Sequence, residues 1–186
     1  MSELWAVRHG KTEWSAAGKH TSTTDLPLLP EGEEVAQGLR ERLAGVEFAQ
    51  VLTSPRLRAR RTAELAGFPD AETDEDLAEW AYGDYEGITT HEIRESVPGW
   101  TIWSHPTPGG ETASQVAERL DRVVARVREV DGPTLVFGHG HALRALAARW
   151  LGEPVDVGRF FVLDTSTISV LGYERETPVL RCWNDA

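Results

Sequence analysis

Two histidines follow short apolar stretches of this chain, and they are the first candidates for chemistry. His9 stands next to Arg8, directly after the apolar residues 4–7, and His139 comes shortly after the apolar residues 134–137. A neutral imidazole can attack phosphorus in line and take up the phosphoryl group, which splits the hydrolysis of a phosphate ester into two steps. The planar guanidinium of an arginine matches the oxygens of that group. A single Arg-His pair is more often an ordinary surface feature, so the rest of the sequence must support this chemistry.

A group of arginines follows Ser54 and Pro55, with four arginines in six residues. Ser54 as N-cap and Pro55 at the first helical position predict the start of a helix. Arginines are unfavourable near the positive end of a helix dipole. One of them, Arg58, is therefore a candidate for binding an anion. We expect Arg60 and Arg61 to face solvent and pair with carboxylates.

The alkoxide that leaves a phosphate ester needs a proton, so a carboxylic acid is also required. Glu79 lies beside Trp80 in residues 77–87, a stretch rich in aromatic, acidic and glycine residues. In its protonated form Glu79 would protonate the leaving oxygen, and it would then deprotonate the attacking water. A single glutamate is more commonly an ordinary surface acid. Its role therefore depends on where the fold places it.

Apolar periodicity predicts the elements that position these residues. The first strand ends near Arg8, where Gly10 would allow the backbone to approach a ligand closely. Strands alternate with helices, and this alternation predicts a three-layer α/β sandwich with a mainly parallel sheet. Ligands bind at the carboxyl ends of such strands, so His9 and His139 should meet there if their strands are neighbours. Strands are expected near 4–7, 51–52, 134–137, 168–173 and 179–183, and helices near 35–45, 54–63, 90–97, 112–130 and 142–151, with Val35, Leu39 and Leu43 as the apolar stripe of the first helix and a capping box at Thr112 and Gln115.

Length and charge limit the possible partners. One domain spanning residues 1–186 is the natural expectation for a chain of this length. The net charge of −11 argues against nucleic acid or an anionic membrane surface as a partner. Cys182 is the only cysteine, which excludes an intrachain disulfide and a cysteine-rich zinc site. The sequence shows neither a leader peptide nor a membrane-spanning run, so we expect a cytoplasmic protein.

Four motifs in order resemble the histidine phosphatase superfamily, in its phosphoglycerate mutase-like branch. The resemblance covers about residues 4–173, and its motifs are closest to those of sedoheptulose-1,7-bisphosphatase-type and small broad-specificity phosphatases. It implies a phosphohistidine intermediate on His9, a proton donor at Glu79 and a phosphate pocket made by Arg8, Arg58 and His139. The motifs are Arg8-His9-Gly10, residues 54–63 around Arg58-Ala59, residues 79–87 from Glu79 to Gly87, and His139-Gly140.

Residues around these motifs complete the predicted site, and several of them depart from the family pattern. Lys11 replaces the usual Glu or Gln, Ser15 replaces a phosphate-contacting Asn, and His141 stands where glycine is frequent. The surplus of basic residues and the aromatic residues Trp80, Tyr82, Trp100 and Trp103 favour a phosphorylated sugar, with a bisphosphate as the leading candidate. We predict that Gly140 and Ser15 bind phosphate, and that Lys19, His20, Thr21 and Tyr82 bind the rest of the substrate, with Lys11, His141 and Arg144 as further basic groups.

Three alternative functions remain open at this point. His9, His139 and His141 could form a metal hydrolase site, although the arginines would repel a cation. The fold could also serve as a non-catalytic module that binds a phosphorylated ligand. A phosphoglycerate mutase is the third alternative, but the chain lacks the long basic insertion of the mutases. The preferred prediction is a metal-independent phosphatase without cofactors that acts on small phosphorylated metabolites, as a monomer or homo-oligomer.

Overall fold

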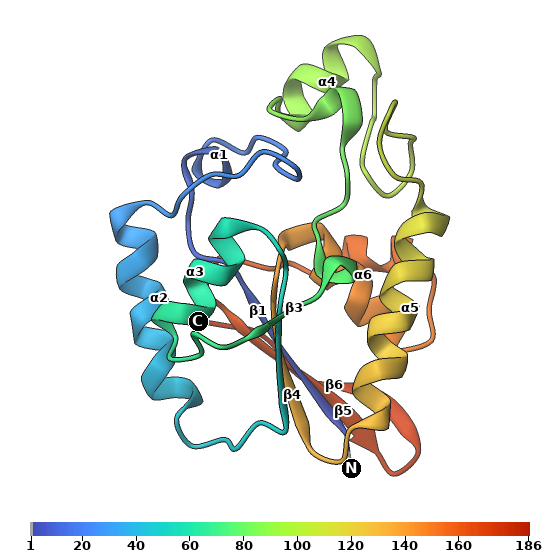
Figure 1. Ribbon diagram of the computed structural model, residues 1–186. Coiled ribbons are helices and arrows are strands. Elements are labelled where there is room, and N and C mark those ends of the chain that lie inside the picture. Colours follow the sequence, from blue (N-terminus) through green and yellow to red (C-terminus); the bar gives the residue numbers. More distant parts are fainter. Residues whose placement is uncertain (1) are drawn as a thin grey trace.

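The computed structural model describes residues 2–186, which form a six-stranded sheet with helices on both faces (Figure 1). The strand order is β3-β2-β4-β1-β5-β6. The first four strands pair in parallel, and β5 pairs antiparallel with both of its neighbours, β1 and β6. The predicted α/β fold with a mainly parallel sheet is thereby confirmed. The strands are β1 (Glu3–Arg8), β2 (Gln50–Thr53), β3 (Glu72–Thr73), β4 (Pro133–Gly138), β5 (Ile168–Glu174) and β6 (Thr177–Asp185).

Each face of the sheet has its own apolar core, which is what makes the architecture three-layered. On one face α2 (Pro30–Leu43) and α3 (Leu57–Leu65) pack near Val7 and Phe137. On the other face lie α5 (Ala113–Glu129) and α6 (Gly140–Trp150). The valines and the leucine of α5 are buried in this core, as are the leucines and alanines of α6. Burial of this apolar area is the main favourable contribution to folding.

Two short helices lie beyond the carboxyl ends of the parallel strands, at the top of Figure 1. The polar segment predicted as a loop contains α1 (Glu13–Ala16), a single turn closed by a capping box between Thr12 and Ser15. The other helix is α4 (Thr90–Ser96), as predicted, and it has a capping box of its own. Three 3₁₀ helices complete the described elements: η1 (Glu75–Leu77), η2 (Gly83–Tyr85) and η3 (Val155–Phe160).

Two details of the predicted helices were wrong. The buried face of α2 contains Gly32, Ala36, Leu39 and Leu43, whereas Val35 is 56% exposed, because the buried positions follow steps of four, three and four residues around the helix and not the constant step of four that was expected. Ser54 does not cap α3. That helix begins at Leu57, whose N–H donates to a carboxylate oxygen of Asp25 from a distant loop.

Gly10 allows a close approach, but to a helix and not to a ligand as expected. A Cβ at Gly10 would lie 2.7 Å from the carbonyl oxygen of Gly32 in α2, and a Cβ at Gly32 would lie 2.4 Å from that of Lys11. Both distances are too short for any side chain. The two glycines therefore let α2 pack directly against the turn that follows β1, which holds that turn in place beside His9.

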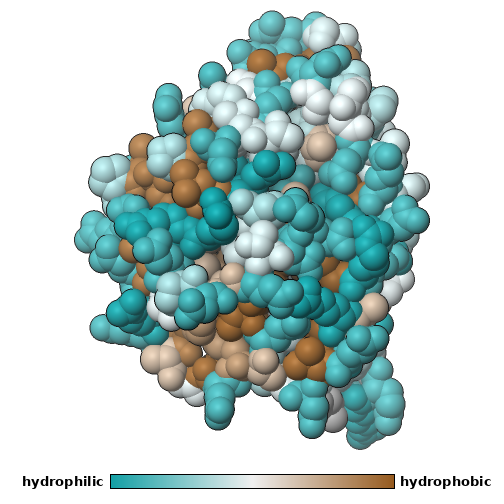
Figure 2. Space-filling view, in the orientation of Figure 1, coloured by the Kyte–Doolittle hydropathy of each residue, from teal (hydrophilic) through white to brown (hydrophobic). Residues whose placement is uncertain are grey.

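Figure 2 shows that hydrophilic residues cover most of the visible face and that hydrophobic residues occur in separate groups. No helix within residues 2–186 is both long enough and apolar enough to cross a bilayer.

Candidate active site

His9 and His139 meet at the carboxyl ends of two neighbouring strands. β1 and β4 are parallel, and Arg8 at the end of β1 lies opposite Gly138 at the end of β4. His9, which follows β1, therefore lies beside His139, which follows β4. The two imidazole rings are 5.2 Å apart between centroids, and both side chains are buried. The predicted meeting of the two histidines is confirmed.

The His9 ring is oriented by its own backbone neighbour. Its Nδ1 donates to the carbonyl oxygen of Gly10 at 2.8 Å, and the Gly10 N–H donates to the Thr62 hydroxyl at 2.9 Å. With the proton on Nδ1, the lone pair of Nε2 is available for attack on phosphorus. Burial, and then the positive charges of Arg58 and Arg8, hold the pKa of His9 well below 6.5. The arginines contribute to this lowering, but burial is the larger cause.

His139 is held by Ser54, the residue that does not cap α3. The Ser54 hydroxyl and His139 Nε2 are 2.6 Å apart, and Ser54 Oγ also accepts the N–H of Arg56. Donation from this hydroxyl to Nε2 places the ring proton on Nδ1, which is buried and has no partner among the described residues. Burial, and then the charge of Arg58, lower the pKa of His139 well below 6.5. His139 is therefore a neutral hydrogen-bond donor.

Arg8 and Arg58 are both anchored by main-chain carbonyls. Arg8 donates to the carbonyl of Leu163, and Arg58 donates to those of Thr21, Ser22 and Thr24. The Nε atom of each arginine is buried and has no hydrogen-bond partner within the described chain. Burial lowers the pKa of both groups. The anchoring fixes two cations beside His9.

Glu79 lies beside the first turn of α6, at the same edge of the sheet as His9 and His139. It is 7% exposed, and its carboxylate accepts the N–H groups of Trp80, His141 and Ala142 at 2.9, 3.1 and 2.7 Å. Two of these donors belong to the first turn of α6, where the helix dipole favours a carboxylate. The helix that follows His139 thereby positions the candidate proton donor.

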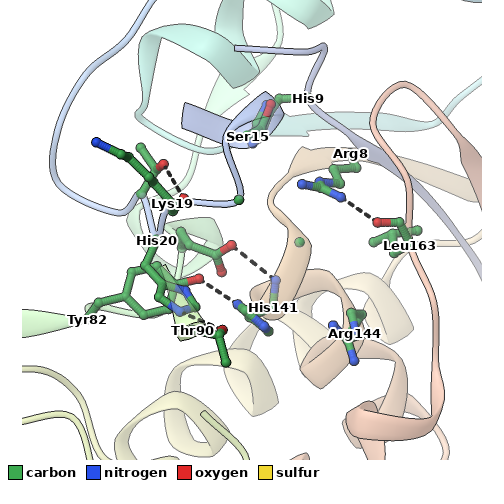
Figure 3. Close-up of a pocket in the computed structure, with 14 residues that line it drawn as sticks. Arg8, His9, Ser15, Lys19, His20, Tyr82, Thr90, His141, Arg144 and Leu163 are labelled. Carbon is green, nitrogen blue, oxygen red and sulfur yellow. Dashed lines mark hydrogen bonds between the residues drawn. The ribbon is translucent and has the colours of Figure 1, made fainter. Parts of the chain in front are cut away.

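A pocket of about 250 Å³ joins these groups (Figure 3). Arg8 and His9 lie on one side of it, and His20, Tyr82 and Thr90 lie on the side away from Arg8. Arg58 and His139 are fully buried next to His9 and do not form part of the pocket wall. The wall consists of Arg8, His9, Ser15, Gly18, Lys19, His20, Thr21, Glu79, Tyr82, Thr90, Gly140, His141, Arg144 and Leu163.

Every residue predicted to touch the substrate beyond the phosphate lies in this wall: Lys19, His20, Thr21 and Tyr82. Ser15 and Gly140 lie there too. Gly18, Thr90 and Leu163 were missed, because nothing in their local sequence separates them from ordinary helix and loop residues. Lys11 pairs with Glu31 at 3.4 Å outside the wall.

The aromatic residues mostly do not line the pocket, contrary to expectation. Trp80 and Trp100 are 2% and 1% exposed and belong to the apolar core, and Trp103 packs beneath the guanidinium of Arg144. Only Tyr82 lies in the wall.

His20 and His141 are neutral, which corrects the prediction that they add positive charge to the pocket. Burial lowers the pKa of His20 to about 4, and burial also lowers that of His141 well below 6.5. His20 Nε2 lies 3.2 Å from the Thr90 hydroxyl, and His141 Nδ1 lies 2.6 Å from the Tyr82 hydroxyl. This side of the pocket is a set of uncharged hydrogen-bonding groups, flanked by the cations Lys19 and Arg144.

The residues proposed for a metal site do not form one. His9 Nδ1, His139 Nε2 and His141 Nδ1 are each engaged by a different protein group. Within residues 2–186, no group of three His, Cys, Asp or Glu side chains is arranged to hold a metal ion.

Comparison with known proteins agrees with this geometry. Residues 4–186 match the model of the histidine phosphatase superfamily (branch 1). The chain is 41% identical to an acid phosphatase of Mycobacterium tuberculosis, over 92% of this chain and 86% of the relative. It is 40% identical to sedoheptulose 1,7-bisphosphatase of Saccharomyces cerevisiae, over 78% of this chain and 66% of the relative.

A solved structure of a Mycobacterium tuberculosis open reading frame product superimposes with a TM-score of 0.96 at 38% identity, covering 100% of this chain and 98% of that one. Fold, site and similarity therefore agree: the chain belongs to branch 1 of the histidine phosphatase superfamily.

Proposed function

We propose that this protein hydrolyses phosphomonoesters of small metabolites, without a metal ion, through a phosphohistidine on His9. Family membership and phosphatase relatives at 40–41% identity support a phosphoric monoester hydrolase. The proposal adds the intermediate, the roles of the residues and the substrate class.

One observation supports the mechanism above the others. Three buried nitrogen donors around His9, the Nε atoms of Arg8 and Arg58 and Nδ1 of His139, have no hydrogen-bond partner among the described residues. Leaving such groups unpaired is costly, and the three residues that carry them all lie near His9, which favours an anion beside His9 as their partner. Arginine and imidazole donors suit the oxygens of a phosphoryl group.

The reaction would then proceed in two steps. Nε2 of His9 attacks phosphorus while Glu79, in its acid form, gives its proton to the leaving alkoxide. In the second step the Glu79 carboxylate removes a proton from water, and that water attacks the phosphorus and releases inorganic phosphate. Arg8, Arg58 and His139 hold the phosphoryl oxygens throughout, and Ser15 and Gly140 border the same space.

A sugar phosphate suits the remainder of the pocket. The Tyr82–His141 and His20–Thr90 pairs offer uncharged hydrogen-bonding groups to hydroxyls, and Lys19 and Arg144 could meet a second phosphate at the edge. The name of the yeast relative supports a sugar bisphosphate as one candidate. The corrected charge of the histidines makes a sugar monophosphate an equally suitable substrate.

Two other functions are less well supported. A non-catalytic binding module would not need both a nucleophile and a carboxyl group at this distance from the phosphate donors. A phosphoglycerate mutase would have to keep water from its intermediate, and the sequence lacks the long basic insertion that is expected of the mutases. A small phosphorylated metabolite in the cytoplasm is accordingly the proposed substrate, which agrees with the presence of a single cysteine.

The deciding experiment is a substrate panel. Purified protein should release inorganic phosphate from p-nitrophenyl phosphate and sugar phosphates, and vanadate should inhibit it as a mimic of the trigonal-bipyramidal state. Activity should survive exhaustive chelation. Activity that is lost in chelator and restored by zinc or magnesium would overturn the mechanism, and exchange between 2- and 3-phosphoglycerate faster than hydrolysis would favour a mutase.

Sedoheptulose 1,7-bisphosphate, its monophosphate and phosphoserine should be compared in wild type and Lys19→Ala to decide whether a second phosphate is recognised.

A further inference from the structure

A short segment of main chain, residues 21–24, is held between opposite charges. Its N–H groups face the carboxylate of Glu86, and its carbonyl groups face the guanidinium of Arg58. Glu86 follows η2, far from both groups in sequence, and the catalytic steps described above do not use it.

Glu86 binds the segment through several donors at once. Ser22 N–H lies 2.9 and 3.0 Å from the two carboxylate oxygens, the Ser22 hydroxyl donates at 2.8 Å, and Thr24 N–H donates at 3.0 Å. Partial burial raises the pKa of Glu86, but together the hydrogen bonds from Thr24 and Ser22 lower it by more than burial raises it. The pKa of Glu86 therefore lies below its ordinary value. The carboxylate is therefore ionised wherever the enzyme would be assayed.

Arg58 receives the other side of the same segment. Its Nη1 donates to the Thr24 carbonyl at 3.1 Å, and its Nη2 donates to those of Thr21 and Ser22 at 3.0 and 3.2 Å. These contacts use both terminal nitrogens and leave Nε without a partner among the described residues. The direction of the Nε–H bond is thus set by where the three carbonyls lie.

No ion pair joins Glu86 to Arg58 within the described chain, and the segment is bonded to both of them. The N–H groups of Ser22 and Thr24 turn toward Glu86, and each of them orients a peptide group of the segment. The carbonyls of the same two residues turn toward Arg58. A flexible loop would otherwise lose this geometry readily, since short polar loops have little packing to order them.

We propose that Glu86 is a positioning residue that orients Arg58 toward the phosphoryl group through the main chain of residues 21–24. The inference rests on the proposed function for the role of Arg58, but the positioning itself can be measured without substrate.

The test compares Glu86→Gln with Asp84→Asn. Asp84 lies in η2, two residues before Glu86, and within residues 2–186 it forms no hydrogen bond with residues 21–24, so this variant removes the same charge without touching the segment. An amide at position 86 keeps the shape but presents an NH₂ group to backbone donors, which disorders the segment. The first readout is the ¹⁵N–¹H resonance of Arg58 Nε, assigned by its loss in Arg58→Lys. It should shift in Glu86→Gln and stay in place in Asp84→Asn.

The second readout is the dissociation constant for vanadate. Glu86→Gln should raise it about tenfold, the scale expected when hydrogen bonds to a charged group are disturbed. Arg58→Lys keeps the charge but removes the fork. Because both changes act on the same contact, the double variant should bind no more weakly than Arg58→Lys alone.

The outcomes separate the two proposals. An unshifted Arg58 resonance in Glu86→Gln, or additive losses in the double variant, would overturn the positioning role. A lowered melting temperature with unchanged vanadate binding would show that Glu86 is merely structural, and would overturn it as well. Failure of the wild type to bind vanadate would instead count against the proposed function, and the resonance alone would then decide the positioning role.

Discussion

The His9 and His139 rings lie 5.2 Å apart, yet each is oriented by a different part of the chain: His9 by the carbonyl of Gly10 and His139 by the hydroxyl of Ser54. The first arrangement leaves a lone pair on His9 Nε2, and the second leaves a proton on His139 Nδ1. Two chemically identical side chains are thereby prepared for opposite tasks, one as nucleophile and one as hydrogen-bond donor.

Replacing His9 by alanine should abolish turnover while the protein remains folded. The covalent step needs this imidazole, so kcat should fall by at least about a thousandfold. Acid-labile, base-stable phosphate trapped on the wild type should be absent from His9→Ala. His91→Ala is the matched control, because the His91 side chain is 87% exposed on α4. A His9→Ala enzyme that turns over normally would falsify the mechanism.

Replacing Glu79 by glutamine should affect substrates according to their leaving groups. An amide cannot protonate an alkoxide, whereas p-nitrophenolate leaves without a proton. The variant should therefore lose far more of its kcat/KM on a sugar phosphate than on p-nitrophenyl phosphate, by about a hundredfold as a scale for general acid catalysis. Glu95→Gln, at an exposed position of α4, controls for the loss of a charge. Equal slowing on both substrates would remove Glu79 from the acid role.

Stability should decrease as the pH falls from about 6.5 toward 4. The pKa values of His9, His20, His139 and His141 are all lowered by burial in the folded state, that of His20 to about 4. Below about 6.5 the unfolded chain therefore binds protons that the folded chain does not, and the free energy of unfolding falls. Each histidine contributes a slope of at most about 1.4 kcal/mol per pH unit.

Urea unfolding at about pH 7.5, 6.5 and 5.5 would measure this slope above the range in which carboxylates titrate. His20→Asn should be less stable at neutral pH but should lose stability less steeply as the pH falls. A slope identical to that of the wild type would contradict the assignment of a neutral His20.

Removing the Tyr82 hydroxyl should change specificity more than chemistry. Burial raises the pKa of Tyr82 well above 10, so its hydroxyl stays protonated, 2.6 Å from His141 Nδ1. With the hydroxyl as the donor, the His141 proton lies on Nε2, where it can serve a substrate oxygen. In Tyr82→Phe, kcat/KM for a sugar phosphate should fall about tenfold, the scale of one hydrogen bond. The value for p-nitrophenyl phosphate should change little.

Tyr85→Phe is the matched control, since Tyr85 packs against Trp100 outside the pocket wall. An equal loss on both substrates would argue against hydroxyl recognition by this pair.

The sequence by itself predicted five of the six strands and the identity of the reactive residues, but not the two-residue edge strand β3. Apolar runs ending at Arg8 and Gly138 predicted two strands, and parallel strands necessarily bring their carboxyl ends to one edge. His9, His139, Arg58 and Glu79 could be chosen because they belong to four motifs that occur in order, whereas each residue alone would fit an ordinary surface position. The capping box at Thr112 was equally local and is present in α5.

Only the tertiary structure decided the charge and the orientation of these groups. His20 and His141 are basic residues in sequence, but burial beside Tyr82 makes them neutral, and burial is a property of the whole fold. The partners of Ser54, Glu86 and Asp25 lie 85, 64 and 32 residues away, so no local pattern could reveal that Ser54 serves His139, that Glu86 binds Ser22 or that Asp25 caps α3. Sequence spacing can indicate which residues reach one edge of a sheet. The hydrogen bonds that set proton positions there come from chain segments that meet only when the fold is complete.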